Sequence, residues 1–441
     1  MNFIKSYFGI DGQNTTIKKE VIAGLTTFLT MAYIIFVNPN ILSTTGMDKG
    51  AVFVATCLAA ATGCFIMGFV AKLPVALAPG MGLNAFFTYS VVLGMGYTWQ
   101  IALGAVFLSG CVFLLLGIFK VRKWIINAIP KGLKQGIVAG IGAFLAFIAM
   151  QNSGIIVDNP AVLVGLGKFT FSSSMALLGF LLITALSHFR ITGAVTIGVL
   201  SIAIISLLAG YTQYSGFVSM PPSITPTLMQ LDIAGAFNIG MVSVIFAFLF
   251  VDLFDTSGTL IAVAKQSKLM DEEGEIKNLD KALLADATAT ITGSLYGTSS
   301  TTSYIESTAG VVAGGRTGLV AVVVGALFLL SLFFAPLAGM IPAYATAGAI
   351  LYVSVLMLES LTDLNWKDIR EFAPAVVCTI TTPLTYSIAD GITIGFISYT
   401  ALQILTGKFK EINAVVWVLT AILVLKITGL LDMIFATLGT M

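Results

Sequence analysis

The sequence predicts an all-α polytopic membrane protein with about fourteen transmembrane segments, arranged as two inverted repeats of seven. Composition is the first of three observations behind this prediction. Hydrophobic residues make up 57% and charged residues 10% of the 441 residues, and the mean hydropathy is +0.99. An ordinary soluble domain carries about 25% charged residues, whereas a bilayer solvates apolar faces without them. The other two observations are the order of the apolar runs and the placement of Lys and Arg between them.

Apolar runs that can lie within a membrane follow one another along most of the chain. Several are shorter than the ~20 residues that a simple helical span needs. A further apolar stretch at 412–438 is interrupted by Lys426 and Asp432, so it is either a hairpin or an extra span. The fourteen runs are 21–41, 51–71, 77–94, 100–119, 134–151, 173–189, 194–210, 236–257, 281–295, 300–314, 317–339, 343–358, 370–389 and 390–407.

The basic residues gather on one side of the membrane if every run crosses it once. With the N-terminus in the cytoplasm, nineteen of the 22 Lys and Arg residues lie in the N-terminal tail or in inner loops. Lys49 and Lys168 lie outside, and Lys426 belongs to the ambiguous last stretch. The positive-inside rule therefore supports both the count and the orientation. It predicts a multi-pass protein of the cytoplasmic membrane with its N-terminus inside.

Two internal sequence matches indicate a repeat. The segment GAVFL at 104–108 matches GALFL at 325–329, and ITGAVTIGV at 191–199 resembles IADGITIGF at 388–396. Seven runs separate the copies of the first match. Because seven is odd, the two halves have opposite orientations in the membrane. Inverted repeats are typical of transporters, which bind substrate near the midplane at broken helices.

Composition also excludes several functions. The net charge of +1 does not indicate a nucleic-acid partner. The four cysteines form no CxxC pair and lie in apolar runs, so we interpret them as small apolar residues. His188 is the only histidine, which excludes a histidine metal cluster and leaves no nucleophile–base pair for an enzyme. We therefore expect no metal and no cofactor, and only protons as a coupling ion.

Three acidic residues are predicted to lie deep in the membrane, namely Asp252, Asp255 and Glu306. A carboxylate in hydrocarbon is costly unless it is protonated or paired, so such residues are usually functional. Their own runs contain no Lys or Arg, which makes all three candidates for proton coupling. Asp252 and Asp255 share a helix face with Thr259 one turn further on. The alternative is that both aspartates end the helix near the inner surface, beside Lys265.

Glu306 lies in a segment that is too polar to face lipid. Nine of the eleven residues at 298–308 carry a hydroxyl group, and Ser307 follows the glutamate directly. An extended stretch that leads into a half-helix explains this composition, because its backbone groups then line a cavity. Ser303 and Glu306 also fit a capping box, which would start the half-helix at Ser303. A half-helix N-terminus at the midplane is itself a ligand site.

The equivalent segment of the first half is 73–89, where two prolines and two glycines discourage a continuous helix. Asn84 then lies near the start of a second half-helix. Its amide can donate and accept hydrogen bonds, and Phe86 and Phe87 could stack on a ring. The alternative is that Asn84 only satisfies neighbouring backbone groups. Carboxylates, an amide and hydroxyls together suit a flat, neutral heterocycle with N–H donors, and they suit an inorganic anion poorly.

Three motifs resemble one known family. APGMGLNAFF at 78–87, VDLFDTSGTL at 251–260 and GTSSTTSYIESTAGVVAGGRTGL at 297–319 are similar to motifs of the azaguanine-type adenine/guanine/hypoxanthine permeases of the nucleobase–cation symporter family. The resemblance extends over nearly the whole chain. It implies proton-coupled purine uptake, with short strands in segments three and ten. By motif match, Asn84, Asp252, Asp255 and Glu306 fall on the family's key polar positions, and we add Thr259 and Ser307 as substrate contacts.

The resemblance also implies a division into a core and a gate domain. Homodimers are common in that family, although no residue here indicates one. More distant uracil-type relatives place a histidine where this chain has Thr259, so a histidine proton route does not transfer. The implied parts are a cytoplasmic tail at 1–20, core halves at 21–119 and 236–339, gate halves at 120–210 and 340–407, an extracellular loop at 211–235 and an apolar C-terminal segment at 408–441.

Two other transport functions remain open at this point. One is a uracil- or xanthine-type permease of the same fold. The other is an anion transporter or channel on this fold, which a basic residue in segment three or ten would favour. The two segments, 77–94 and 300–314, contain no such residue.

Overall fold

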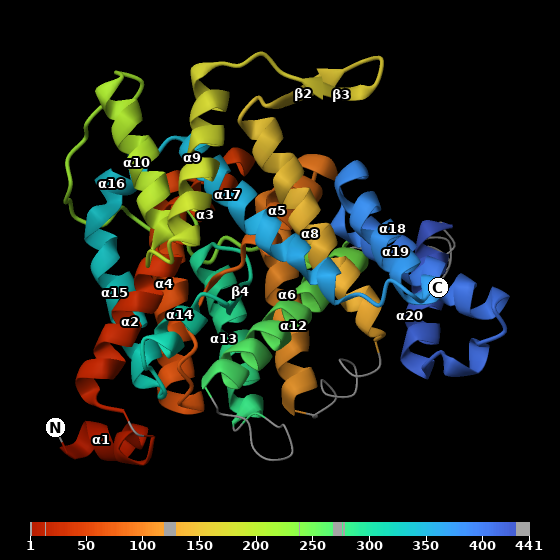
Figure 1. The fold of residues 1–441 in the computed structure, drawn as a ribbon, viewed down its shortest axis with the longest axis horizontal. Helices are drawn as coiled ribbons and strands as arrows, with labels where there is room; N and C mark the ends of the chain where they lie inside the picture. Colours follow the sequence, from red (N-terminus) through yellow and green to blue (C-terminus); the bar gives the residue numbers. More distant parts are fainter. Residues whose placement is uncertain are drawn as a thin grey trace.

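The computed structural model describes residues 2–13, 15–118, 129–237, 239–267, 276 and 278–428, and these residues are almost entirely helical (Figure 1). Within them, nine helices are long and apolar enough to cross a membrane, and three shorter apolar helices accompany them. The chain is therefore an integral polytopic membrane protein. The nine are Ile17–Thr45, Lys49–Ala71, Trp99–Ile118, Lys131–Asn152, Phe171–His188, Gly240–Ser267, Leu319–Gly339, Ala343–Asp363 and Ile388–Leu405.

The first half begins with a short N-terminal helix and ends with a helical pair. A β-hairpin separates two of its long helices (Figure 1). Its elements are α1 (Asn2–Phe8), α2 (Ile17–Met31), α3 (Ile34–Leu42), α4 (Lys49–Ile66), the π-helix η3 (Met67–Ala71), β1 (Leu77–Pro79), α5 (Met81–Ala85), the π-helix η4 (Phe86–Gly94), α6 (Trp99–Ile118), α8 (Lys131–Asn152), β2 (Ile156–Asn159), β3 (Leu163–Leu166), α9 (Phe171–His188) and α10 (Ala194–Leu208).

The second half repeats this order of elements. In both halves a long helix leads into a three-residue strand, a short helix and another long helix: α4–β1–α5–α6 in the first and α13–β4–α14–α15 in the second. Its elements are α11 (Ile233–Ala236), α12 (Ile239–Ser267), α13 (Leu279–Tyr296), β4 (Thr301–Ser303), α14 (Ser307–Val312), α15 (Leu319–Ser331), α16 (Ala335–Gly339), α17 (Ala343–Leu358), α18 (Ile369–Leu384), α19 (Ile388–Leu405) and α20 (Ala414–Ile427).

Several boundaries differ from those predicted. Helix α12 continues ten residues beyond 257, since its polar end, which includes Lys265 and Gln266, can face solvent. The break between α18 and α19 was predicted at 389–390, but α18 ends at Leu384 and α19 starts at Ile388. The cause is the Ser387 hydroxyl, which accepts the amide of Asp390 and caps α19. The stretch 412–438 contains α20, and its last ten residues lie outside the described part of the chain.

The helices pack in two groups. In one group α13 packs on α4 and α6, and α15 packs on α2 and α4. In the other, α8 packs on α17 and α18, and α9 packs on α10 and α17. Small residues allow the close approach: a Cβ at Gly136 of α8 would meet the backbone of Ala375 in α18 at 2.5 Å.

Contacts between loops agree with the two membrane sides that the charges predict. On the predicted inner side, the Lys72 ammonium donates to the Tyr7 carbonyl, at 2.9 Å, and the Asn278 amide donates to the Ala71 carbonyl, at 3.1 Å. On the predicted outer side, the 211–235 loop donates backbone hydrogen bonds to Gln100, Leu295 and Phe333. These contacts join only loops that were assigned to the same side.

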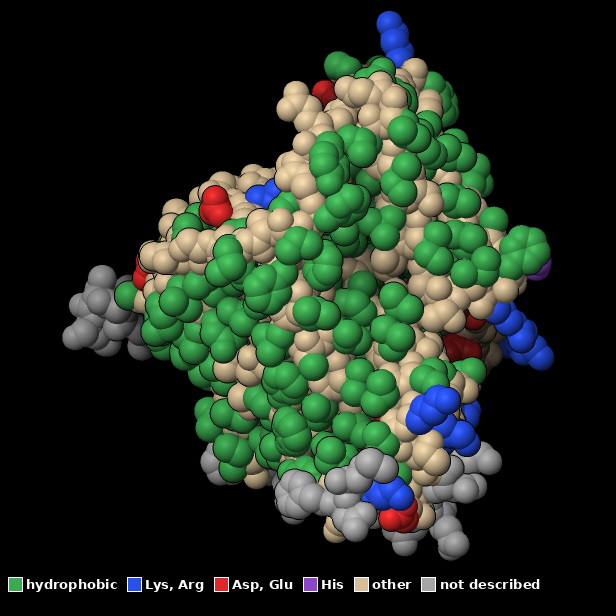
Figure 2. All heavy atoms as spheres, turned by 90° about the vertical axis from the view of Figure 1, so that its left-hand side faces the viewer, with side chains coloured by type: hydrophobic (Ala, Val, Ile, Leu, Met, Phe, Trp, Pro, Cys, Tyr) green, Lys and Arg blue, Asp and Glu red, His purple; other side chains and the backbone are tan. Residues whose placement is uncertain are grey.

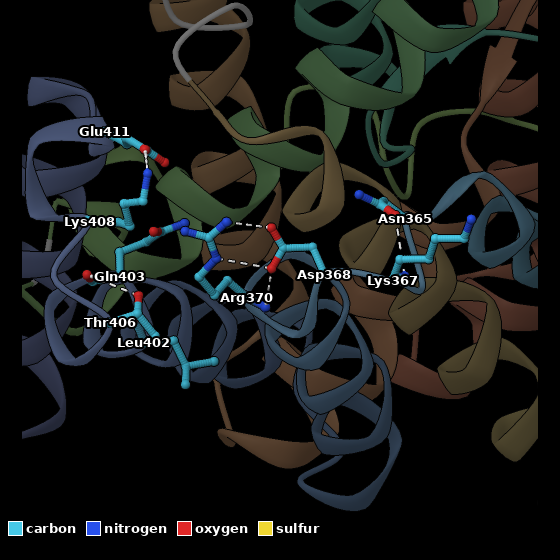
Figure 3. Close-up of polar contacts among 9 residues, drawn as sticks. All are labelled: Asn365, Lys367, Asp368, Arg370, Leu402, Gln403, Thr406, Lys408 and Glu411. Atoms are coloured by element: carbon cyan, nitrogen blue, oxygen red, sulfur yellow. Dashed lines mark hydrogen bonds and ion pairs between the residues drawn. The ribbon is translucent and has the colours of Figure 1, made fainter.

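Two charged segments lie at the start of α18 and after the end of α19 (Figure 3). The Arg370 guanidinium donates to both Asp368 oxygens, at 3.0 and 2.6 Å, and lowers the pKa of that carboxyl. Lys408 pairs with Glu411 at 2.5 Å. Exposed pairs of this kind add little stability. They indicate instead that this end of the helices lies in water or at the headgroups, on the side predicted to be inner.

The outer surface of the helices is apolar. Figure 2 shows hydrophobic side chains over most of one face, with few charged side chains and those mainly toward its margins. Leu25 and Leu29 of α2, Leu330 of α15 and Phe333 are among the exposed apolar residues. A contiguous apolar surface of this extent needs lipid around it.

Glu20 is a further deep carboxylate. It was predicted to lie in the N-terminal tail, and that prediction was wrong. Its side chain is fully buried at the start of α2. The carboxylate accepts the backbone N–H groups of Arg316 and Thr317, at 2.9 and 3.1 Å, and the Thr317 hydroxyl, at 2.7 Å. Because these donors come from the loop before α15, Glu20 ties the two halves together. Sequence position alone does not predict this burial.

Candidate functional site

Two short strands form the centre of the molecule. Strand β1 pairs antiparallel with β4, so that Leu77 lies opposite Ser303 and Pro79 opposite Thr301. Every residue of both strands is buried. Equivalent strands that run in opposite directions agree with the inverted repeat that the sequence predicts. The two broken segments are 77–94 and 300–314, and they satisfy each other's backbone groups inside the apolar interior.

Further hydrogen bonds extend this pairing on both sides. The Gly80 amide donates to the Ser300 carbonyl and the Tyr304 amide donates to the Ala76 carbonyl, each at 2.9 Å. The Tyr304 hydroxyl donates to the carbonyl of Pro79 at 2.6 Å. Short helices α5 and α14 follow the strands directly. Their N-termini therefore lie on either side of the strand pair.

Glu306 is the residue before α14 and is only partly buried. The Tyr33 hydroxyl, from the turn between α2 and α3, donates to Glu306 Oε1 at 2.6 Å. The capping-box alternative was wrong: α14 begins at Ser307, and the Glu306 side chain makes no capping hydrogen bond. The Ser303 hydroxyl donates to Asp286 instead, at 3.0 Å, because Ser303 belongs to β4. The Glu306 carboxylate is thus available beside the strand pair.

Asp252 and Asp255 lie within α12, well before its end at Ser267, so they do not end the helix. Asp255 is partly buried and accepts the Thr302 hydroxyl of β4 at 3.3 Å. Asp252 is almost fully buried and accepts the Thr290 hydroxyl of α13 at 3.1 Å. Both aspartates therefore face the layer that β4 and α13 form, and Asp255 is the more accessible of the two.

Asn84 lies in α5 and is fully buried. Its side-chain oxygen accepts the Ser299 hydroxyl, while its Nδ2 atom has no hydrogen-bond partner among the described residues. The buried Ser300 hydroxyl also lacks a partner there. Buried polar atoms without partners are rare and call for an explanation such as a missing ligand. The alternative that Asn84 satisfies neighbouring backbone does not account for its free amide group.

The remaining predicted residues are placed differently. Thr259 is buried one turn beyond Asp255, and the described residues give it no hydrogen bond that links it to the carboxylates. The Ser307 hydroxyl accepts the amide of Ala76 at 3.0 Å, which fastens α14 to β1. Phe86 and Phe87 are fully buried, and the Phe86 ring packs edge-on against Phe248. These aromatic rings contribute to the core.

Asp286 is a buried carboxylate that the sequence interpretation missed, because it placed this residue near the end of a segment. It is fully buried in α13 and accepts the Thr256 hydroxyl of α12, at 2.8 Å, as well as the Ser303 hydroxyl. A second pair of the same kind joins the same two helices, with the aspartate now on α12 and the threonine on α13: Asp252 accepts the Thr290 hydroxyl. The spacing of Asp286 and Thr290, four residues apart like Asp252 and Thr256, is the signal that could have found it.

Polar contacts also join the two helix groups on the predicted outer side of the strand pair. The Asn152 amide at the end of α8 donates to the Tyr89 hydroxyl at 2.6 Å. The Ser90 hydroxyl donates to the carbonyl of Tyr386, at 2.8 Å, and the Tyr386 ring packs edge-on against Tyr89 and Phe144.

Comparison with known proteins gives one consistent result. The model of the Permease family (Xan_ur_permease) matches residues 18–394. The adenine permease AdeP of Escherichia coli is 48% identical, over 96% of this chain and 96% of its own. The guanine/hypoxanthine permease PbuG of Bacillus subtilis is 44% identical, over 96% of this chain and 99% of its own. A relative from Methanocaldococcus jannaschii is 50% identical, over 97% of this chain and 98% of its own.

Solved structures show the same fold at low sequence identity. The transmembrane domain of the cyanobacterial bicarbonate transporter BicA superposes with a TM-score of 0.63 at 15% identity, over 85% of this chain and 97% of that domain. Murine Solute Carrier 26 family member A9, an anion transporter, superposes with a TM-score of 0.69 at 11% identity, over 92% of this chain and 72% of its own. Identity this low supports the fold alone.

The Asp286 contacts predict a loss of stability without a change in the accessible site. In Asp286→Ala the Thr256 and Ser303 hydroxyls lose their acceptor, which should cost about 1–3 kcal/mol. The apparent melting temperature of the purified protein should fall clearly. The matched control is Asp280→Ala, because Asp280 is exposed in the first turn of the same helix and contributes only a few tenths of a kcal/mol. Equal melting temperatures for the two variants would contradict this role of Asp286.

Proposed function

This chain belongs to the Permease family, and from that premise we propose that it carries purine nucleobases across the cytoplasmic membrane together with protons. The observation that carries the proposal is the set of groups around the strand pair. Asn84 offers a free amide, and Asp255 and Glu306 offer carboxylate oxygens that are partly accessible. The family relatives that act on adenine and on guanine or hypoxanthine support the purine class.

Purine chemistry fits these groups. A purine ring carries N–H donors on one edge and ring-nitrogen acceptors on another. Glu306 and Asp255 would accept from the donors, and the Asn84 amide would donate to an acceptor. Tyr33 would hold the Glu306 carboxylate through its 2.6 Å hydrogen bond. Thr259 and Ser307 stay secondary candidates for substrate contact, because neither lies in a hydrogen bond with the three main residues.

The same groups disfavour the anion-transport alternative. The fold is shared with transporters of inorganic anions, but the strand pair here is flanked by Asp255 and Glu306, which would repel an anion. The broken segments 77–94 and 300–314 contain no basic residue. The relatives also disfavour the uracil- or xanthine-type alternative, because the names of AdeP and PbuG specify adenine, guanine and hypoxanthine.

Proton coupling would use the carboxylates. Asp255 and Glu306 flank the strand pair, and the broken segments 77–94 and 300–314 offer no basic partner. The two carboxylates repel each other in a low dielectric, so that one of them holds a proton in the loaded state. We assign the proton to Asp255 within the Asp252–Asp255 pair, because Asp255 is the more accessible. Glu306 would then be mainly a substrate ligand. Opening of the site to the cytoplasm would release both proton and purine.

We further propose the membrane arrangement that the sequence predicts: about fourteen segments, the N-terminus inside and two domains that move against each other. The group around α4, α13 and α15 would be the core, and the group around α8, α17 and α18 would be the gate. The contacts of Tyr89 and Ser90 with the gate would keep the outer side shut. Alternating access would break these contacts each time the site opens outward.

The first prediction concerns Glu306. In Glu306→Gln one charged hydrogen bond to the purine is lost, which should cost ~1.5–3 kcal/mol, or about ten- to a hundredfold in affinity. Equilibrium binding of labelled hypoxanthine to purified protein measures this. Glu359→Gln, at an exposed helix end, is the matched control. Unchanged affinity in a folded Glu306→Gln protein would remove Glu306 from the substrate site.

The second prediction concerns coupling. Asp255→Asn mimics the protonated form, so it should keep hypoxanthine exchange between equal pools and lose uphill uptake driven by a pH gradient. Asp252→Asn is the matched control on the same helix face. If Asp255→Asn still accumulates hypoxanthine under an acid-outside gradient, and a protonophore collapses that accumulation, then Asp255 is not the coupling group and Glu306 becomes the candidate.

The third prediction concerns orientation. Single cysteines at Ser215 and Gln266, both exposed positions, are placed in a background without native cysteines. An impermeant maleimide added to intact cells should label position 215 and not position 266. The reverse pattern would overturn the orientation. Permeabilised cells, in which both positions should react, provide the control for accessibility.

A further inference from the structure

A cavity lies away from the strand pair, where four stretches of chain meet. It has a volume of about 260 Å³ and opens to the surface on the predicted inner side. The N-terminal stretch, the turn after η3, the residue before α13 and the loop before α15 all contribute to it. Its lining includes Tyr7, Gln13, Lys72, Asn278, Arg316 and Thr317.

The lining is basic. Lys72 and Arg316 are the two charged residues of the cavity wall, and the described part of the chain gives neither of them an ion pair. Glu20 lies behind the wall, and its carboxylate is already occupied by the amides of Arg316 and Thr317. Asn278 and Gln13 add amide groups that can donate. Two unpaired cations with neutral donors form a site for an anion.

Both cations are held at the cavity by their neighbours. The Arg316 Nη1 atom donates to the carbonyls of Val311 and Gly315, at 2.6 and 2.7 Å, so the rest of the guanidinium remains free to donate. The Lys72 ammonium donates to the Tyr7 carbonyl and lies 4.3 Å from the centre of the Tyr7 ring. Lys72 also adopts a positive φ of 59°, which is uncommon for a long side chain.

The cavity borders an apolar surface. The Phe69 ring lies 6.3 Å from that of Tyr7 and 6.0 Å from that of Phe8. Phe69 and Val70 of η3 are exposed hydrophobic residues, as is Ile4 of α1. A soluble phosphate ester would gain nothing from these side chains. The acyl chains of a lipid would cover them while its headgroup enters the cavity.

We infer that this cavity binds the phosphate of an anionic glycerophospholipid from the inner leaflet, with Lys72 and Arg316 as the cationic ligands. The lipid would link the N-terminal helix α1 to the end of η3 and to the loop before α15. The site is separate from the residues of the proposed purine site, so neither assignment depends on the other.

The test measures lipid binding to the purified full-length protein in detergent, by native mass spectrometry and by thermal stabilisation. The probes are dioleoyl phosphatidylglycerol and, with the same acyl chains, dioleoyl phosphatidylcholine. Phosphatidylglycerol should bind more tightly and raise the melting temperature more. Lys72→Asn, which tolerates a positive φ, and Arg316→Gln should each weaken phosphatidylglycerol binding about fivefold. The matched control Lys367→Gln, which removes an exposed cation that does not line this cavity, should bind like the unaltered protein.

Three results would overturn the inference. Equal binding of both lipids would remove the role of charge. Unaltered phosphatidylglycerol binding in Lys72→Asn would remove the cavity, and this variant decides the matter if Arg316→Gln does not fold. Stabilisation by inorganic phosphate or glycerol 3-phosphate equal to that by the lipid, at equal concentration and with the same response to Lys72→Asn, would identify a soluble phosphate ester as the ligand.

Discussion

The antiparallel pairing of β1 with β4 is the interaction on which the rest of the molecule depends. An extended backbone inside a membrane has no water to satisfy its N–H and C=O groups. Each broken segment therefore exists only because the other supplies partners, from Leu77 opposite Ser303 to Pro79 opposite Thr301. The pairing fixes where α5 and α14 begin, and thus where Asn84 and Glu306 lie. Asp255 reaches the same place through Thr302 of β4.

The carboxylates of the helical part of the molecule differ in their surroundings, and those surroundings suggest different roles. Glu20 and Asp286 are fully buried and engaged by donors from neighbouring elements. Asp252 resembles them, since it is buried against Thr290. Asp255 and Glu306 are partly exposed, and each accepts one hydroxyl group. Accessible carboxylates are suited to substrate and protons, whereas enclosed ones connect helices.

The sequence predicted the centre of the molecule better than its edges. Proline and glycine at 73–82 discourage a continuous helix, and the hydroxyl groups at 298–308 are too polar for a helix that faces lipid. Both segments therefore indicate broken helices without further information. The burial of Asp286 and Glu20 has no comparable signal in the composition, and only the spacing of Asp286 and Thr290 points to the first of them. This burial depends on Thr256, Ser303 and the loop before α15, which are distant in sequence. The capping box at Ser303 was wrong for a related reason, since pairing with β1 takes that residue into a strand.

The most direct test of the account is a counterflow experiment with the purified protein in proteoliposomes. Vesicles loaded with unlabelled hypoxanthine take up labelled hypoxanthine from outside, while a panel of unlabelled compounds competes. We predict that adenine, guanine and hypoxanthine compete, and that uracil and bicarbonate do not. Absence of hypoxanthine counterflow in vesicles that hold folded protein, or competition by uracil or bicarbonate as effective as that by the purines, would contradict the assignment of the strand-pair site to a purine.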